Sequence, residues 1–206
     1  MTAYTEPASR ASIDKAAAAL EANGFRAVVA KDRAAAREAV LGLIPKGAEV
    51  FTMSSVTLEE TGLAEVLNGP DYDSVRERFK AMDPARHAKE MRARGSAPDW
   101  SLGSVHALTE GGSLVIASLT GSQLPAQVYG AGNVVLVVGA QKIVKDLDAA
   151  MERLERHVVP LESVRAREAY GLPEGFKTFP SKILTWNRET TPDRATVVIV
   201  EESLGF

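Results

Sequence analysis

Two short apolar runs dominate the pattern of hydrophobic and polar positions along the chain. They span Ser113–Ala117 and Val134–Val138, are rich in Val, Ile and Leu, and are bounded by Gly, Ser and Thr. Continuous apolar runs of this length are typical of strands buried on both faces, as in a parallel sheet covered by helices. The pattern therefore predicts two inner strands of an α/β sheet.

The rest of the chain alternates between helical periodicity and further short apolar runs. Helices are expected over 12–22, 32–45, 57–67, in two pieces within 71–94, and over 104–110, 124–129 and 146–170, with a break at Pro160. Strands are expected over 25–30, 48–53, 182–187 and 195–201, and the turn at Thr191-Pro192-Asp193 predicts that the last two form an antiparallel hairpin. The order predicts a three-layer α/β domain with a mostly parallel sheet and a C-terminal antiparallel hairpin. We expect one unit over 48–206, with a helical insertion over 71–100, and an N-terminal extension over 1–47 packed on it.

Polar residues gather where several of the expected strands end. The groups are Ser54, Ser55 and Thr57; Ser118, Thr120, Gly121, Ser122 and Gln123; and Gln141 with Lys142. Ligands bind at the carboxyl edge of open α/β sheets, and backbone amides, hydroxyls and a lysine suit a carboxylate or phosphate. The sequence therefore predicts a site for a small anion, while helix capping, a capped turn and an exposed lysine are the structural alternatives.

A carboxylate at a glycine-rich turn is the candidate for catalysis. Glu110 stands before Gly111-Gly112, where a carboxylate could act as a nucleophile or general base. On a helix over 104–110 it would share a face with His106, four residues earlier. A surface turn or an exposed ion pair would explain the same residues. The histidines at 87, 106 and 157 lack metal-ligand spacing, so we expect no metal.

Composition narrows the classes of function. The chain has 206 residues, 45% hydrophobic and 25% charged, as expected of one soluble domain. Its net charge of −3 gives no reason to expect nucleic acid or a membrane surface. It has no cysteine, which excludes disulfides, a thiolate nucleophile and an iron–sulfur cluster held by this chain alone. With neither a signal peptide nor a spanning segment visible, a cytoplasmic location is expected. A basic run over 76–94 is typical of a solvated helix face, with docking of an acidic partner as the alternative.

Four segments, taken together and in this order, resemble the LUD domain of LutC/YkgG-type lactate-utilisation proteins. They are T-E-G-G-S-L-V at 109–115, S-L-T-G-S-Q-L-P at 118–125, V-V-G-A-Q-K-I-V at 137–144, and S-K-I-L-T-W-N-R-E at 181–189 followed by T-V-V-I-V. The resemblance runs from about residue 48 to residue 206. It implies a fold similar to that of ribose-5-phosphate isomerase, glucosamine-6-phosphate deaminase and the CoA transferases.

The resemblance also implies a role beside iron–sulfur and oxidoreductase subunits in converting L-lactate to pyruvate. The iron–sulfur cluster would then lie in a partner, with no cofactor bound by this chain, and a homodimer stays open. Gly130-Ala131-Gly132 precedes a strand, so it supplies no dinucleotide-binding turn. In CoA transferases of similar fold, a Glu beside glycines is the nucleophile. Three functions thus remain: an accessory subunit that binds a small anionic ligand, a CoA-transferase- or sugar-phosphate-isomerase-like enzyme using Glu110, and a ligand sensor or scaffold without catalysis.

Overall fold

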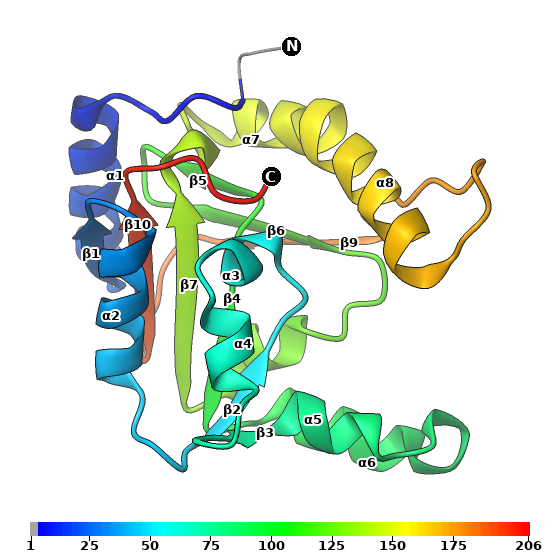
Figure 1. Cartoon of the computed structure of the whole chain (residues 1–206). Coiled ribbons are helices and arrows are strands. Elements are labelled where there is room, and N and C mark those ends of the chain that lie inside the picture. The colour runs from blue at the N-terminus through cyan, green and yellow to red at the C-terminus, as the bar shows by residue number, and fades with distance from the viewer. Residues whose placement is uncertain (1–3) are drawn as a thin grey trace.

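The computed structural model describes residues 4–206, which fold around two β-sheets (Figure 1). The helices are α1 (Arg10–Ala22), α2 (Arg33–Leu43), α3 (Val56–Glu60), α4 (Leu63–Leu67), α5 (Val75–Lys80), α6 (Pro84–Ser96), α7 (Leu147–Arg153) and α8 (Val159–Tyr170). Short helical turns are η1 (Ala126–Gly130), η2 (Ala140–Lys142) and η3 (Leu154–Val158). The strands are β1 (Arg26–Ala30), β2 (Glu49–Thr52), β3 (Asp73–Ser74), β4 (Trp100–Gly103), β5 (Ala107–Thr109), β6 (Leu114–Ser118), β7 (Asn133–Gly139), β8 (Ile143–Val144), β9 (Lys182–Trp186) and β10 (Ala195–Val200).

The larger sheet has six strands in the order β1-β10-β7-β4-β2-β3, and every pair in it is parallel. Its inner strands β7 and β10 are buried on both faces. Val134, Leu136 and Val138 of β7 point into a core shared with α1 and the second sheet. Val135 and Val137 point into a core shared with α2, α3 and α4. The apolar run over 134–138 is therefore an inner parallel strand, as predicted, because both of its faces are covered.

The smaller sheet has the order β8-β5-β6-β9 and is mixed. The apolar run over 113–117 forms β6, which is buried on both faces but pairs antiparallel with β5 and β9 and lies in a different sheet from β7. The helices α7 and α8, with η3 between them, cover the outer face of this sheet. The fold is α/β with a parallel main sheet, and the mixed sheet is an additional layer.

The predicted C-terminal hairpin is wrong. Strand β9 pairs with β6 in the mixed sheet, whereas β10 lies between β1 and β7 in the parallel sheet. Burial explains the separation, because all six residues of β10 are buried, as an inner strand requires, whereas β9 is largely exposed and occupies an edge. The turn around Pro192 therefore links two sheets instead of two paired strands.

The helix expected over 104–110 is also absent. These residues enter β5, and Thr109 and Ser113 close a tight turn onto β6 through a backbone hydrogen bond of 2.9 Å. Gly112 makes this turn with φ +80°, and a Cβ there would lie 2.8 Å from the backbone of Ala19. His106 and Glu110 consequently do not share a helical face.

Most of the helices begin at an N-capping side chain. Asp32, Asp83 and Asp146 each accept a hydrogen bond from a backbone amide in the first turn of the helix that follows. The helix expected over 57–67 begins instead at the cap Ser55 and divides at Gly62, whose φ is +68°. Pro160 does not break the C-terminal helix, because it lies in the first turn of α8, directly after the π-helical turn η3. Among residues 4–206, no helix is long and apolar enough to cross a membrane.

Candidate functional site

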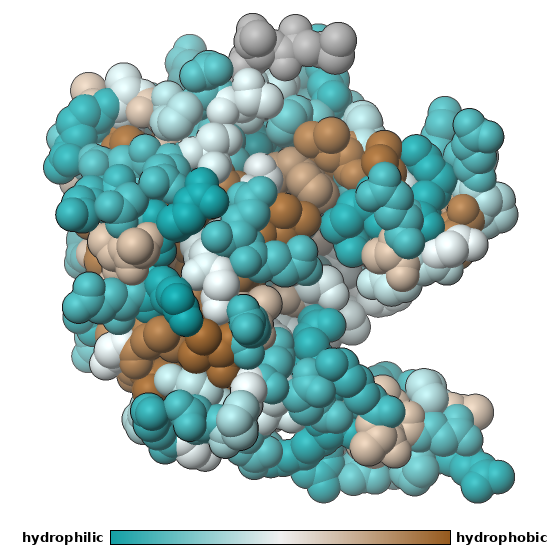
Figure 2. Space-filling model, in the orientation of Figure 1, coloured by the Kyte–Doolittle hydropathy of each residue, from teal (hydrophilic) through white to brown (hydrophobic). Residues whose placement is uncertain are grey.

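A pocket of about 80 Å³ lies at the carboxyl edge of the parallel sheet. Its walls come from the segments that follow β2, β4 and β7, and from α8 and the segment after β6. It adjoins an outer cleft of about 430 Å³, and residues such as Met53, His106 and Gln123 line both. Figure 2 shows the molecule notched between α8 and the α5–α6 pair, on which the outer cleft opens. We call these two spaces the inner pocket and the outer cleft.

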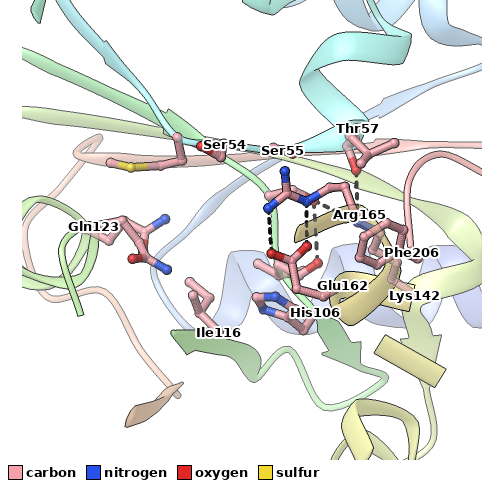
Figure 3. Close-up of a pocket in the computed structure, with 15 residues that line it drawn as sticks. Ser54, Ser55, Thr57, His106, Ile116, Gln123, Lys142, Glu162, Arg165 and Phe206 are labelled. Carbon is pink, nitrogen blue, oxygen red and sulfur yellow. Dashed lines mark hydrogen bonds and ion pairs between the residues drawn. The ribbon is translucent and has the colours of Figure 1, made fainter. Parts of the chain in front are cut away.

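Lys142 is the buried cation of the inner pocket, with only 2% of its surface exposed. It lies in η2, directly after β7, where the chain leaves the parallel sheet for the mixed one. Its Nζ donates to Thr57 Oγ1 at 2.9 Å and to Ser104 Oγ at 3.0 Å (Figure 3). Burial lowers the pKa of Lys142 to about 7, and the charge of Arg153 adds to this effect. A substantial fraction of this amine is therefore neutral near neutral pH.

His106 is held as a neutral ring. Burial lowers its pKa to about 3, and the charges of Lys142 and Arg153 act in the same direction. The backbone N–H of Ala117 donates to His106 Nδ1 at 3.0 Å. Since Nδ1 accepts this hydrogen bond, the proton of the neutral ring resides on Nε2. His106 is thus a hydrogen-bond donor toward the pocket and not a proton-transfer group near pH 7.

Arg153, at the end of α7, is a second buried cation beside this site. Its side chain is fully buried, and its Nη1 donates to the carbonyl oxygen of His106. Nε and Nη2 of Arg153 have no hydrogen-bond partner within residues 4–206. Its charge lowers the pKa of both Lys142 and His106, which places the three groups in one electrostatic cluster.

Two glutamines come from the segment between β6 and β7. Gln123 Oε1 accepts a hydrogen bond of 2.9 Å from Ser118 Oγ, which fixes its side chain at the junction of pocket and cleft. Gln127 is 1% exposed and lines the inner pocket, yet its Oε1 finds no donor in the described part of the chain. A buried amide oxygen without a donor is costly, so Gln127 indicates a place for a ligand or water.

An ion pair from α8 forms the rim. Arg165 donates to both oxygens of Glu162 at 2.6 Å, so the glutamate that lines the pocket is already paired (Figure 3). This pairing raises the pKa of Arg165. On the opposite wall of the outer cleft, Arg76 of α5 donates to the carbonyl oxygen of Thr52 and to Ser54 Oγ.

The comparison with known protein families settles the family. A model of the LUD domain matches residues 13–200. This chain belongs to the LUD domain family. A crystal structure of a DUF162 family protein from Deinococcus radiodurans is similar to it, with a TM-score of 0.58 and 15% sequence identity over 94% of this chain and 99% of that one. That likeness shows the fold alone. No curated protein matches the chain.

The LUD fold brings most of the predicted site residues together. The inner pocket is lined by Ser54, Ser55, Thr57, His106, Gln123 and Lys142. The outer cleft is lined by Ser118, Thr120 and Ser122, together with Ser54, His106 and Gln123. Ser55 also caps α3, so its role as a helix cap is shown alongside its place at the pocket.

Three predicted residues lie outside both spaces. Gln141 is buried and donates to the carbonyl oxygens of Leu204 and Gly205, which anchors the C-terminal segment. Gly121 makes a turn with φ +86° and donates its amide to Ser118 Oγ. Glu110 accepts hydrogen bonds of 2.8 Å from Ser12 and Lys15 of α1, which lowers its pKa.

Several residues that line the two spaces of this LUD domain were not predicted from the sequence: Ser104, Gln127, Glu162, Arg165, Arg76 and Phe206. They come from segments distant in sequence and form no motif. Ser104 carried one signal of a place at the carboxyl edge, because it directly follows the short run Trp100–Gly103, which forms strand β4. Among residues 4–206, no group of three or more His, Asp or Glu side chains is placed to hold a metal ion.

Proposed function

We propose that this LUD-domain protein binds a small carboxylate in the inner pocket and serves as an accessory subunit in the oxidation of L-lactate to pyruvate. The observation that carries the binding proposal is an imbalance of buried charge. Lys142 and Arg153 are both buried beside the pocket, and neither forms an ion pair within residues 4–206. Glu162, which lines the pocket, is already neutralised by Arg165.

A buried cation without a counter-ion is unfavourable, and an anionic ligand would remove that cost. Donors suited to such a ligand line the same space: the Nε2–H of the neutral His106 and the side-chain amide of Gln123. A volume of about 80 Å³ suits an acid of a few heavy atoms, whereas a larger ligand would extend into the outer cleft. Lactate and pyruvate are acids of the smaller size.

The accessory role rests on the family and on the composition of the chain. The resemblance to lactate-utilisation proteins implies a role beside iron–sulfur subunits, and this chain has no cysteine with which to hold such a cluster itself. A partner would therefore supply the redox centre. The cytoplasm is the compartment in which we place this reaction.

The geometry favours binding over the alternative enzyme that would use Glu110. The carboxylate of Glu110 is bonded to Ser12 and Lys15, and it lines neither the inner pocket nor the outer cleft. These contacts give it a role in holding α1 against the turn before β6.

Titration calorimetry with L-lactate, pyruvate, a phosphosugar and an acyl-CoA tests the binding proposal. We expect a small carboxylate to bind, and to bind with net proton uptake at pH 7, because an anion raises the pKa of the partly neutral Lys142. Titration in two buffers of different ionisation enthalpy measures that uptake. Lys142→Met should lose the uptake, and Lys145→Met, an exposed lysine three residues away, should keep it. The proposal fails if no acid binds, or if the Lys142 variant binds with unchanged affinity and uptake.

Affinity purification of the tagged chain from its own cells tests the accessory role. We expect a cysteine-rich iron–sulfur protein to co-purify and lactate oxidation to require that partner. Lactate oxidation by the isolated chain would contradict this role.

A further inference from the structure

The hydrogen bonds around Lys142 have defined directions. Thr57 Oγ1 donates its only proton to the carbonyl oxygen of Leu204 at 3.2 Å. Ser104 Oγ donates its only proton to the carbonyl oxygen of Val105 at 3.4 Å. Each hydroxyl therefore accepts from Lys142 Nζ and cannot donate to it. A neutral amine has two N–H bonds and one lone pair, so the two hydroxyls take both N–H bonds and leave the lone pair free.

The protonated form fits this environment less well. An ammonium has a third N–H, for which no acceptor lies within hydrogen-bond distance among residues 4–206. The charged groups that act on Lys142 are Arg153 of α7, which disfavours its protonation, and Glu60 of α3, which favours it. Glu60 also accepts from the amide of Gly205, and the nearby His106 is neutral. Burial outweighs Glu60, and the pKa of Lys142 falls to about 7.

We infer that Lys142 is a nucleophile whose amine forms a Schiff base with the carbonyl carbon of a 2-oxo acid held in the inner pocket. Buried lysine amines are the usual residues for this chemistry. The inference rests on the proposed function, because it takes the small carboxylate of that proposal and narrows it to one carrying a ketone. A 2-hydroxy acid such as lactate has no electrophilic carbon and would bind only reversibly and without a covalent bond.

The step is balanced within the pocket. The lone pair of Nζ forms the N–C bond, and the π electrons of the carbonyl move to its oxygen. That oxygen takes a proton released from the nitrogen, which gives a carbinolamine. Loss of the hydroxyl as water, together with the second N–H proton, forms the C=N bond. No oxidant or reductant is consumed, and hydrolysis reverses the step. Thr57 and Ser104 orient the amine before the attack, because each accepts one of its two N–H bonds in the free protein.

Reductive trapping tests this inference directly. The full chain is incubated with pyruvate and sodium cyanoborohydride at pH 7.5, with L-lactate in a parallel sample. We expect one adduct per chain with pyruvate, heavier than the protein by the mass of pyruvic acid less one oxygen atom, and none with lactate. Peptide mapping should place the adduct on Lys142, with labelling at least about tenfold above that of any exposed lysine, since the Lys142 amine is partly neutral near pH 7 and lies in the pocket that holds the ligand.

Two lysine variants provide the comparison. Lys142→Arg keeps a cation and removes the nucleophile, so it should abolish the specific adduct. Lys145→Arg alters an exposed lysine three residues along the chain and should leave the adduct unchanged. If Lys142→Arg fails to fold, mapping of the adduct in the unmodified protein still decides the question.

The outcomes separate the two proposals. Binding of pyruvate and lactate by calorimetry, without an adduct on Lys142, overturns the nucleophile and leaves the carboxylate site intact. Labelling spread equally over the exposed lysines overturns the nucleophile as well. Absence of both binding and adduct overturns both proposals. An adduct confined to Lys142 that excess lactate suppresses supports both.

Discussion

Replacement of Lys142 by Met measures what the buried amine costs the fold. The pKa of this lysine falls from 10.5 to about 7 on folding. At 1.36 kcal/mol per pKa unit, this depression opposes folding by about 4 kcal/mol at pH 7 and by about 2 kcal/mol at pH 9. Methionine avoids that cost but loses the hydrogen bonds to Thr57 and Ser104, each worth about 1 kcal/mol. We therefore expect Lys142→Met to be more stable than the parent protein by about 2 kcal/mol at pH 7.

The dependence on pH is the decisive part of this prediction. Because the unfolded chain binds more protons than the folded one between pH 7 and 10.5, the parent protein gains stability from Lys142 as the pH rises. The amount by which the parent protein is less stable than Lys142→Met should shrink by about 2 kcal/mol between pH 7 and pH 9. Urea unfolding at both values measures the free energies, and other titrating groups cancel in the difference. Lys145→Met, which replaces an exposed lysine, is the matched control. A pH-independent difference for Lys142→Met would show that this amine does not lose its proton in the folded state over this range.

Four further variants test other parts of the structure. Glu189→Ala should destabilise the protein by about 3–5 kcal/mol in urea unfolding, because it leaves Arg194 buried without its ion-pair partner, and a loss below about 1 kcal/mol would contradict this. Gly130→Ala should be strongly destabilising, since its Cβ would lie 1.8 Å from the carbonyl oxygen of Ser96. Gly42→Ala, in α2, should instead stabilise by about 0.5–1 kcal/mol, because its added Cβ would have no atom within 4 Å beyond the adjacent turns of the helix backbone. Equal effects of the two variants would refute the packing at Gly130. Arg153→Met removes a charge that lowers the pKa of Lys142. When Lys142→Met is compared with Lys142 in this Arg153→Met background, the pH range over which their stability difference changes should therefore move to higher pH.

The parallel sheet was predictable because its information is local. Runs such as Val134–Val138 and Val197–Val200 are apolar without interruption, and such runs are typical of inner strands of a parallel sheet covered on both faces. The carboxyl-edge rule then placed the residues after β2 and β7 on one side of the molecule, where Ser55, Thr57 and Lys142 do meet.

The mixed sheet was not predictable from the same signals. Strand β6 is as apolar as β7, and periodicity cannot show whether a doubly buried strand has parallel or antiparallel neighbours. Strand β5 has only three residues, too few for a period of two to be distinguished from one turn of helix. Likewise, no local pattern shows that Gln127, which follows β6, and Lys142, which follows β7, line the same pocket. Their common place depends on how the two sheets are joined.

The junction between the sheets explains why the candidate chemistry lies where it does. The chain passes from the parallel sheet to the mixed sheet at Gly103–Ala107 and again at Gly139–Ile143. The first passage carries Ser104 and His106, and the second carries Lys142, so the hydrogen bond between Ser104 and Lys142 ties the two passages together.

A chain leaving one sheet for another cannot satisfy its polar groups by strand pairing there, and side chains or a ligand must do so. Lys142 and Arg153 are buried at this junction with hydroxyl and carbonyl partners and, among residues 4–206, no carboxylate partner. A polar junction that is buried, cationic and open to an outer cleft costs stability, which the Lys142→Met comparison measures. We infer that this cost is retained because the same amine, neutral in part and oriented by Thr57 and Ser104, meets the ligand.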